Sequence, residues 1–132
     1  MTYLLDTNTC IFMMKHIPNV VERFRCAQSS GIAISSITLA ELEFGVSNSH
    51  AYERNRNALL AFSTLLDILP FDIPASAEYG KIRAILEKAG TPIGSLDTLI
   101  AAHAKSRNLT LATNNTREFQ RVKGLSIEDW LN

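Results

Sequence analysis

The sequence predicts an α/β fold of three layers, in which a central, mainly parallel sheet of about four to five strands is flanked by helices. Short apolar or β-branched runs alternate with longer helical stretches, which is the pattern of parallel strands joined by crossover helices. The chain has 132 residues, of which 46% are hydrophobic and 20% charged. This composition is typical of a globular domain, so we expect residues 1–132 to form one domain.

Strands are expected at four short runs, 3–5, 32–35, 67–71 and 109–113, and helices at 8–16, 19–27, 38–47, 52–66, 75–89 and 95–107. Turn residues support this division. Pro18 follows the first helix, Gly31 precedes the second strand, and Gly90 with Pro92 ends the long helix.

Three isolated carboxylates stand out against apolar surroundings. Asp6 follows the first strand, Glu41 lies one turn into the helix after the second strand, and Asp97 lies in the first turn of the last long helix. No lysine or arginine lies three or four residues from Glu41 or Asp97. Ligands of open parallel sheets bind where the strands end, so Asp6 and Glu41 are expected at one edge, and the helix of Asp97 points its apolar stripe toward the sheet.

Carboxylates gathered at one edge repel each other unless a cation lies between them. Oxygen ligands favour a hard ion, so Mg²⁺ or Mn²⁺ is expected at Asp6, Glu41 and Asp97. Each acid also has a simpler interpretation, which stays open here. Asp6 could only cap the next helix, Glu41 could be a half-exposed helix residue, and Asp97 could be an ordinary first-turn aspartate.

Polar residues near the same edge are candidates for a supporting role. Thr113 and Asn115 follow the fourth strand, and Asn8 follows Asp6 by two residues. They could orient carboxylates or waters, although a Thr-Asn-Asn sequence is also a common turn.

The charge of the chain is balanced but uneven. Formal net charge is +0, which argues against binding nucleic acid through overall charge. Between residues 105 and 124, however, five cations face only Glu118, a local net charge of +4. These cations are candidates for contacts with phosphates, a solvated surface being the alternative: Lys105, Arg107, Arg117, Arg121 and Lys123.

The segment Ile11, Phe12, Met13 and Met14 is apolar on every side of its helix. One core-facing stripe would be narrower, so part of the segment either meets another chain or is unusually buried. With Phe44, it forms the candidate surface for a protein partner.

Cys10 and Cys26 form no Cys-x-x-Cys pair, which favours free thiols. The histidines His16, His50 and His103 have no spacing that suits catalysis or metal binding. Because the sequence has neither a signal peptide pattern nor a membrane-length apolar run, we expect a cytoplasmic protein with no membrane partner.

Four segments, 4–8, 35–42, 94–101 and 113–119, resemble the four motifs of the PIN domain in the same order, and most closely those of the VapC toxins of VapBC type II toxin-antitoxin pairs. The resemblance implies a PIN-like domain that acts as a metal-dependent, site-specific endoribonuclease, with Asp6, Glu41 and Asp97 as its catalytic and metal-binding residues. It further implies a tRNA substrate, for this type the anticodon loop of initiator tRNA.

The resemblance also implies a VapB-type antitoxin, a toxin homodimer inside a larger complex, and contact with operator DNA only through the antitoxin. Many relatives carry a fourth acid where this chain has Asn115, which leaves open whether one metal ion or two are bound. Glu118 is a nearby acid that could compensate.

Other classes fit less well. A signalling receiver domain would have adjacent acids after the first strand, and a phosphatase with an aspartyl nucleophile would have an aspartate at Asn8. A catalytically silent PIN-like scaffold that binds RNA or protein remains the alternative.

Overall fold

The computed structural model describes residues 1–132, and it has one sheet of five parallel strands in the order β3-β2-β1-β4-β5. The strands are β1 (Tyr3–Leu5), β2 (Ile32–Ser35), β3 (Asp67–Leu69), β4 (Thr110–Ala112) and β5 (Ile127–Glu128). The helices are α1 (Thr7–Met14), α2 (Pro18–Ala27), the short 3₁₀ helix η1 (Gln28–Ser30), α3 (Ser36–Ser47), α4 (Tyr52–Ser63), α5 (Ile73–Lys88), α6 (Ser95–Ser106) and α7 (Thr116–Phe119). The predicted three-layer α/β fold is therefore confirmed.

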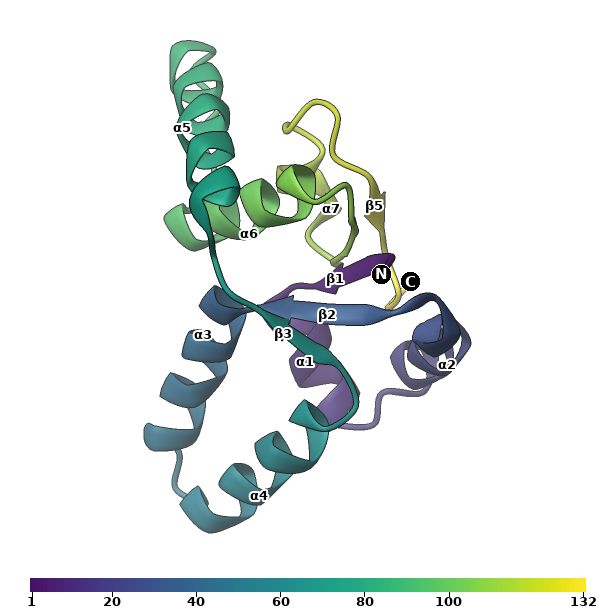
Figure 1. Cartoon of the computed structure of the whole chain (residues 1–132). Coiled ribbons are helices and arrows are strands. Elements are labelled where there is room, and N and C mark those ends of the chain that lie inside the picture. The colour runs from purple at the N-terminus through teal and green to yellow at the C-terminus, as the bar shows by residue number, and fades with distance from the viewer.

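Helices cover both faces of the sheet (Figure 1). Consecutive residues of β1 show why: Leu5 packs into the core cluster shared with α1 to α4, whereas Leu4 packs into the cluster shared with α5 and α6. Both side chains are fully buried. A strand buried on both faces is expected to be largely apolar, which is the sequence that β1 and β2 have, Ser35 at the end of β2 being polar.

The path of the chain creates a place for a site. From β1 the chain moves outward through β2 to β3, and it then returns through α5 and α6 to β4 on the other side of β1. Such a reversal leaves a crevice beyond the carboxyl ends of the two strands at the switch point. Asp6 follows β1 there and Thr113 follows β4.

Several predicted boundaries were wrong by a few residues, for local reasons. The first helix ends at Met14 instead of residue 16, because His16 adopts a left-handed backbone with φ 59°. The third strand ends at Leu69, since the next residue is Pro70, which cannot donate a ladder hydrogen bond. The long helix begins at Ile73 instead of residue 75, because Asp72 caps it through the Ala75 N–H at 3.1 Å.

The strand β5 and the helix α7 were not among the predicted elements. Both are too short to show a periodic pattern. No helix in the structure combines the length and the apolar character needed to cross a membrane.

Candidate active site

Asp6 is the first residue after β1, and only 4% of its surface is exposed. Its Oδ1 accepts a hydrogen bond from the Thr9 N–H at 2.8 Å, which makes Asp6 the N-cap of α1. Burial raises the pKa of the Asp6 carboxyl, hydrogen bonds with Thr113 and Thr9 oppose this increase, and the charge of Glu41 adds to it. Asp6 is thus both a helix cap and a member of an acidic group, so the two interpretations of this residue do not compete.

Glu41 is carried to the same edge by α3, which starts where β2 ends. The Thr7 hydroxyl donates to Glu41 Oε1 at 2.6 Å. Since Thr7 directly follows Asp6, this bond holds the Glu41 carboxylate against the start of α1.

Asp97 lies in the first turn of α6 and is partly buried. It has no hydrogen-bond partner and no ion pair. Burial, together with the charges of Asp6, Glu118 and Glu41 in that order, raises its pKa to about 6. A carboxyl in this environment is stabilised when a cation approaches it.

Glu118 is the fourth acid of this edge. It lies on α7, is partly buried, and its charge acts on Asp97 more strongly than that of Glu41 does. Glu118, three residues after Asn115, therefore adds a fourth negative charge close to Asp97. Asn115 stands at the N-cap position of α7, and its backbone N–H donates to Thr113 Oγ1 at 3.0 Å.

The other two supporting candidates have different surroundings. Thr113 is fully buried, and the interaction of its side chain with Asp6 lowers the pKa of that carboxyl, which suits an orienting role. Asn8 lies exposed on the first turn of α1 and makes no hydrogen bond through its side chain.

None of the four edge acids takes part in an ion pair. The six ion pairs of the molecule all use other carboxylates. No three histidine, cysteine, aspartate or glutamate side chains form a group that could hold a metal ion in their present positions. The acids thus share one edge and act on each other electrostatically without meeting at one point. Their oxygen-only chemistry fits Mg²⁺ or Mn²⁺.

The five candidate RNA-binding cations divide into two groups. Lys105 pairs with Glu78 at 3.3 Å and Arg107 with Asp72 at 3.9 Å, and both lie at the opposite end of α6 from Asp97. The other three, Arg117, Arg121 and Lys123, have no carboxylate partner. Arg121 Nη1 instead donates to the Pro92 carbonyl at 3.1 Å, in the loop that leads to Asp97.

The candidate partner surface contains an apolar groove of about 310 Å³ between α1, α3 and α4. Ile11 and Met14 line it, and Glu41 stands in the same lining. Phe12 and Met13 are partly buried against the core, whereas Phe44 is 68% exposed. The segment 11–14 therefore divides its apolar surface between the core and this groove.

Comparison with known proteins agrees with this arrangement. The PIN domain family model matches residues 3–125. This chain belongs to the PIN domain family. Among its relatives, the tRNA(fMet)-specific endonuclease VapC of Salmonella typhimurium is 48% identical over 129 residues, which cover 97% of either chain. Ribonuclease VapC2 of Rickettsia felis is 43% identical over 132 residues, which cover 98% of either chain. Within the PIN family, the chain is thus one of the VapC proteins.

Solved structures share the fold of this PIN domain. VapBC2 from Rickettsia felis, bound to a DNA fragment from its promoter, superposes with a TM-score of 0.94 at 42% identity and covers 98% of this chain and 99% of the other. DNA-bound VapBC from Salmonella typhimurium gives a TM-score of 0.93 at 47% identity, with 98% of both chains covered.

Sequence reasoning found Asp6, Glu41 and Asp97, and the structure brings them to one edge. From the sequence, Glu118 could either compensate for the acid missing at Asn115 or be a surface residue, because it lies in a segment dominated by cations. The available signal was its position just beyond the carboxyl end of a strand, three residues after Asn115.

Proposed function

We propose that this chain is the toxin of a VapBC pair and that it cleaves RNA as an endoribonuclease that depends on Mg²⁺ or Mn²⁺. One observation carries the proposal: four carboxylates lie at the switch point of the sheet with no cation beside them, and Asp97 has a pKa of about 6. The names of the VapC relatives as endonuclease and ribonuclease support it.

Each acid of the edge has a proposed role in metal binding or proton transfer. The carboxylate oxygens of Asp6, Asp97 and Glu118 would hold the ion. A bound Mg²⁺ or Mn²⁺ supplies a water of lowered pKa and offsets the charge that builds up on the scissile phosphate. Glu41 would complete the metal shell or accept the proton of the attacking water on Oε2, because its Oε1 already accepts from Thr7. With its proton passed to Glu41, the water would attack phosphorus and the bond to the 3′ oxygen would break. That oxygen would take up a proton, so the products would carry 5′-phosphate and 3′-hydroxyl ends.

The substrate we propose is a tRNA, cut in the anticodon loop of the initiator. The Salmonella typhimurium relative is named for tRNA(fMet). A chain of balanced charge is suited to a structured, locally recognised RNA. The cations without carboxylate partners, Arg117, Arg121 and Lys123, would contact the phosphates, and Lys105 and Arg107 would contribute only where RNA displaces their acidic partners.

The partner we propose is a VapB-type antitoxin, whose apolar segment would fill the groove lined by Ile11 and Met14 and would extend over Phe44. Because Glu41 lines the same groove, an antitoxin bound there would also cover one of the acids. The complex we propose is a toxin homodimer within a larger assembly that reaches operator DNA through the antitoxin. The related VapBC structures with bound DNA support an assembly of toxin, antitoxin and DNA.

The test is to incubate antitoxin-free protein with total cellular RNA in Mg²⁺, Mn²⁺ or chelator, and to sequence the fragment ends. We expect discrete metal-dependent cuts with 5′-phosphate ends, and none with Asp6→Asn. Intact RNA under every condition would reject the nuclease and favour the alternative, a silent PIN-like scaffold that binds RNA or protein.

A further inference from the structure

A closed set of contacts joins three segments of the chain, and the proposed chemistry leaves it unused. The Ser35 hydroxyl oxygen lies 2.8 Å from His103 Nδ1. The His103 ring packs edge-on against Phe71, with ring centroids 5.4 Å apart and an interplanar angle of 80°. The Phe71 N–H donates to Ser36 Oγ at 3.0 Å, which closes the set next to Ser35. We call these four residues the His103 cluster.

Packing alone does not account for a histidine at this position. His103 is 0% exposed, and its Nε2 has no hydrogen-bond partner. Burial lowers its pKa, so the ring is neutral at pH 7. A buried ring nitrogen without a partner costs stability that a leucine of similar size would not. The bond to Ser35 is what a histidine adds.

The bond from His103 to Ser35 lies between the two helices that carry edge acids. Ser35 Oγ also accepts the Ile37 N–H at 3.1 Å, and so caps α3, the helix of Glu41. His103 lies on α6, six residues after Asp97, which is about 9 Å along a helix. Because a helix is stiff over that length, the bond fixes the start of α3 relative to α6.

The remaining members of the His103 cluster fix the same junction from the other side. Phe71 lies between β3 and α5, and its bond to Ser36 ties that connection to the first residue of α3. The two serines are adjacent in sequence, so the junction of β2 and α3 is held by α6 at Ser35 and by the β3–α5 connection at Ser36.

We propose that His103 is a positioning residue that sets the distance between Glu41 and Asp97 through its bond to Ser35. The proposal rests on the proposed metal-dependent cleavage of RNA at these acids. His103 touches neither metal nor RNA in this role. Residues that hold metal ligands in place commonly change metal affinity or activity by about 10- to 100-fold when they are replaced.

The test compares His103→Leu, which removes the bond and keeps the volume, with His103→Asn, whose side-chain amide can reproduce Nδ1. Trp130→Phe is the control, because it changes a large buried side chain that packs on Tyr3 and Phe24 and makes no hydrogen bond to the four edge acids. For each variant, kcat and KM are measured on the RNA that the wild type cuts, and Mn²⁺ affinity is measured by calorimetry. Unfolding temperatures show whether the variants are folded.

We expect His103→Leu to lower kcat by roughly 10- to 100-fold, to weaken Mn²⁺ binding, and to leave KM for RNA within about twofold. His103→Asn should recover most of both losses, and Trp130→Phe should show neither. Weaker Mn²⁺ binding beside the lower kcat separates positioning from partial unfolding. Partial unfolding would lower the apparent kcat at an unchanged KM without weakening the Mn²⁺ affinity of the folded fraction.

Wild-type kcat and Mn²⁺ affinity in His103→Leu would overturn this inference and leave the proposed function intact. Equal losses in Trp130→Phe would also overturn it. If His103→Leu does not fold, Ser35→Ala takes its place, and the same two measurements decide. If the wild type neither cleaves RNA nor binds Mn²⁺, the proposed function fails and this inference fails with it.

Discussion

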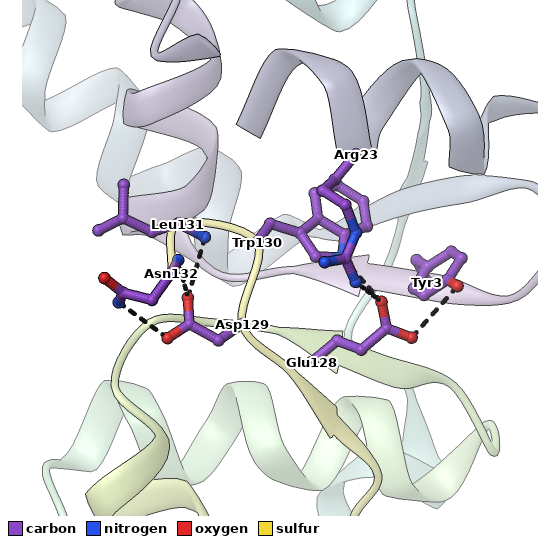
Figure 2. Close-up of polar contacts among 7 residues, drawn as sticks. All are labelled: Tyr3, Arg23, Glu128, Asp129, Trp130, Leu131 and Asn132. Atoms are coloured by element: carbon purple, nitrogen blue, oxygen red, sulfur yellow. Dashed lines mark hydrogen bonds and ion pairs between the residues drawn. The ribbon is translucent and has the colours of Figure 1, made fainter. Parts of the chain in front are cut away.

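The chain holds two groups of carboxylates in opposite surroundings. At the sheet edge, Asp97 has no partner and its pKa is raised to about 6. At the C-terminus, Glu128 Oε1 accepts from Arg23 Nη2 at 2.7 Å and from Trp130 Nε1 at 3.1 Å, and its Oε2 accepts from the Tyr3 hydroxyl at 3.3 Å (Figure 2).

The carboxylate of Asp129, next to Glu128, also accepts several hydrogen bonds. Its oxygens accept from the Leu131 N–H at 2.9 Å and from the Asn132 N–H at 3.2 Å and side-chain amide at 3.0 Å. Burial alone would raise the pKa of Asp129, but these hydrogen bonds lower it below its ordinary value. The C-terminal acids therefore stabilise the fold, whereas the edge acids are held in place at a cost to stability, which is typical of a functional site.

The largest expected difference between the two groups is in RNA cleavage. Asp97→Asn should lower the cleavage rate on the order of 100-fold or more, because it removes a charge that would hold the metal. Glu128→Gln, which changes the same charge at the other group, should leave the rate within about twofold. Initial rates on one RNA substrate measure the effect of each substitution. A comparable loss of rate in Glu128→Gln would contradict a specific role of the edge acids in cleavage.

Metal binding should stabilise the protein through the edge acids alone. At a free Mn²⁺ concentration of about 100 times Kd, the free energy of unfolding should rise by about 2.7 kcal/mol. The increase should be lost in Asp97→Asn and kept in Glu128→Gln. Urea titrations with Mn²⁺ or chelator give this value, and an unchanged wild-type midpoint would contradict a metal site at this edge.

Removal of the Glu128 carboxylate, which accepts hydrogen bonds near the C-terminus, should instead lower the free energy of unfolding. Glu128→Ala leaves the Trp130 indole N–H and Arg23 without their partner, which should cost about 1–2 kcal/mol of unfolding free energy. Cleavage per folded molecule should not change. Urea denaturation and cleavage rates measured on one sample test the stability and the activity. A variant as stable as the wild type would show that the hydrogen bonds to Glu128 in Figure 2 do not stabilise the fold.

The smallest effect is the pH dependence of stability without metal. The raised pKa of Asp97 means that the folded state binds its proton more tightly than the unfolded state between pH 3.8 and about 6. Unfolding free energy should therefore fall as pH rises through this window. Asp97→Asn should gain about 1 kcal/mol at pH 8, after allowance for partial exposure, and nothing at pH 3.

Asp129 should show the opposite sign. Its lowered pKa gives stability that is present above the ordinary pKa of 3.8 and is lost as the pH falls below it. Without metal, in the presence of a chelator, Asp129→Asn should thus lower the free energy of unfolding at pH 8 and not at pH 3. Urea midpoints of Asp97→Asn and Asp129→Asn at the two pH values test the comparison. It would be contradicted if both substitutions changed the stability at pH 8 in the same direction.

The sequence alone determined the fold class and three of the four edge acids. Asp6, Glu41 and Asp97 interrupt apolar runs, and a lone carboxylate in such a run is costly enough to need a reason. Parallel strands joined by helices then place the ends of β1 and β2 at one edge, a consequence of chain geometry that needs no knowledge of side-chain contacts.

Only the tertiary structure decided which other residues reach that edge. Glu118 arrives there because α7 follows β4, and β4 lies beside β1 although more than 100 residues separate them. The contact between Ser35 and His103 spans 68 residues, and the strand β5 has only two. Periodicity and capping act over a few residues, so they are visible in a sequence, whereas contacts between distant residues depend on how the layers pack.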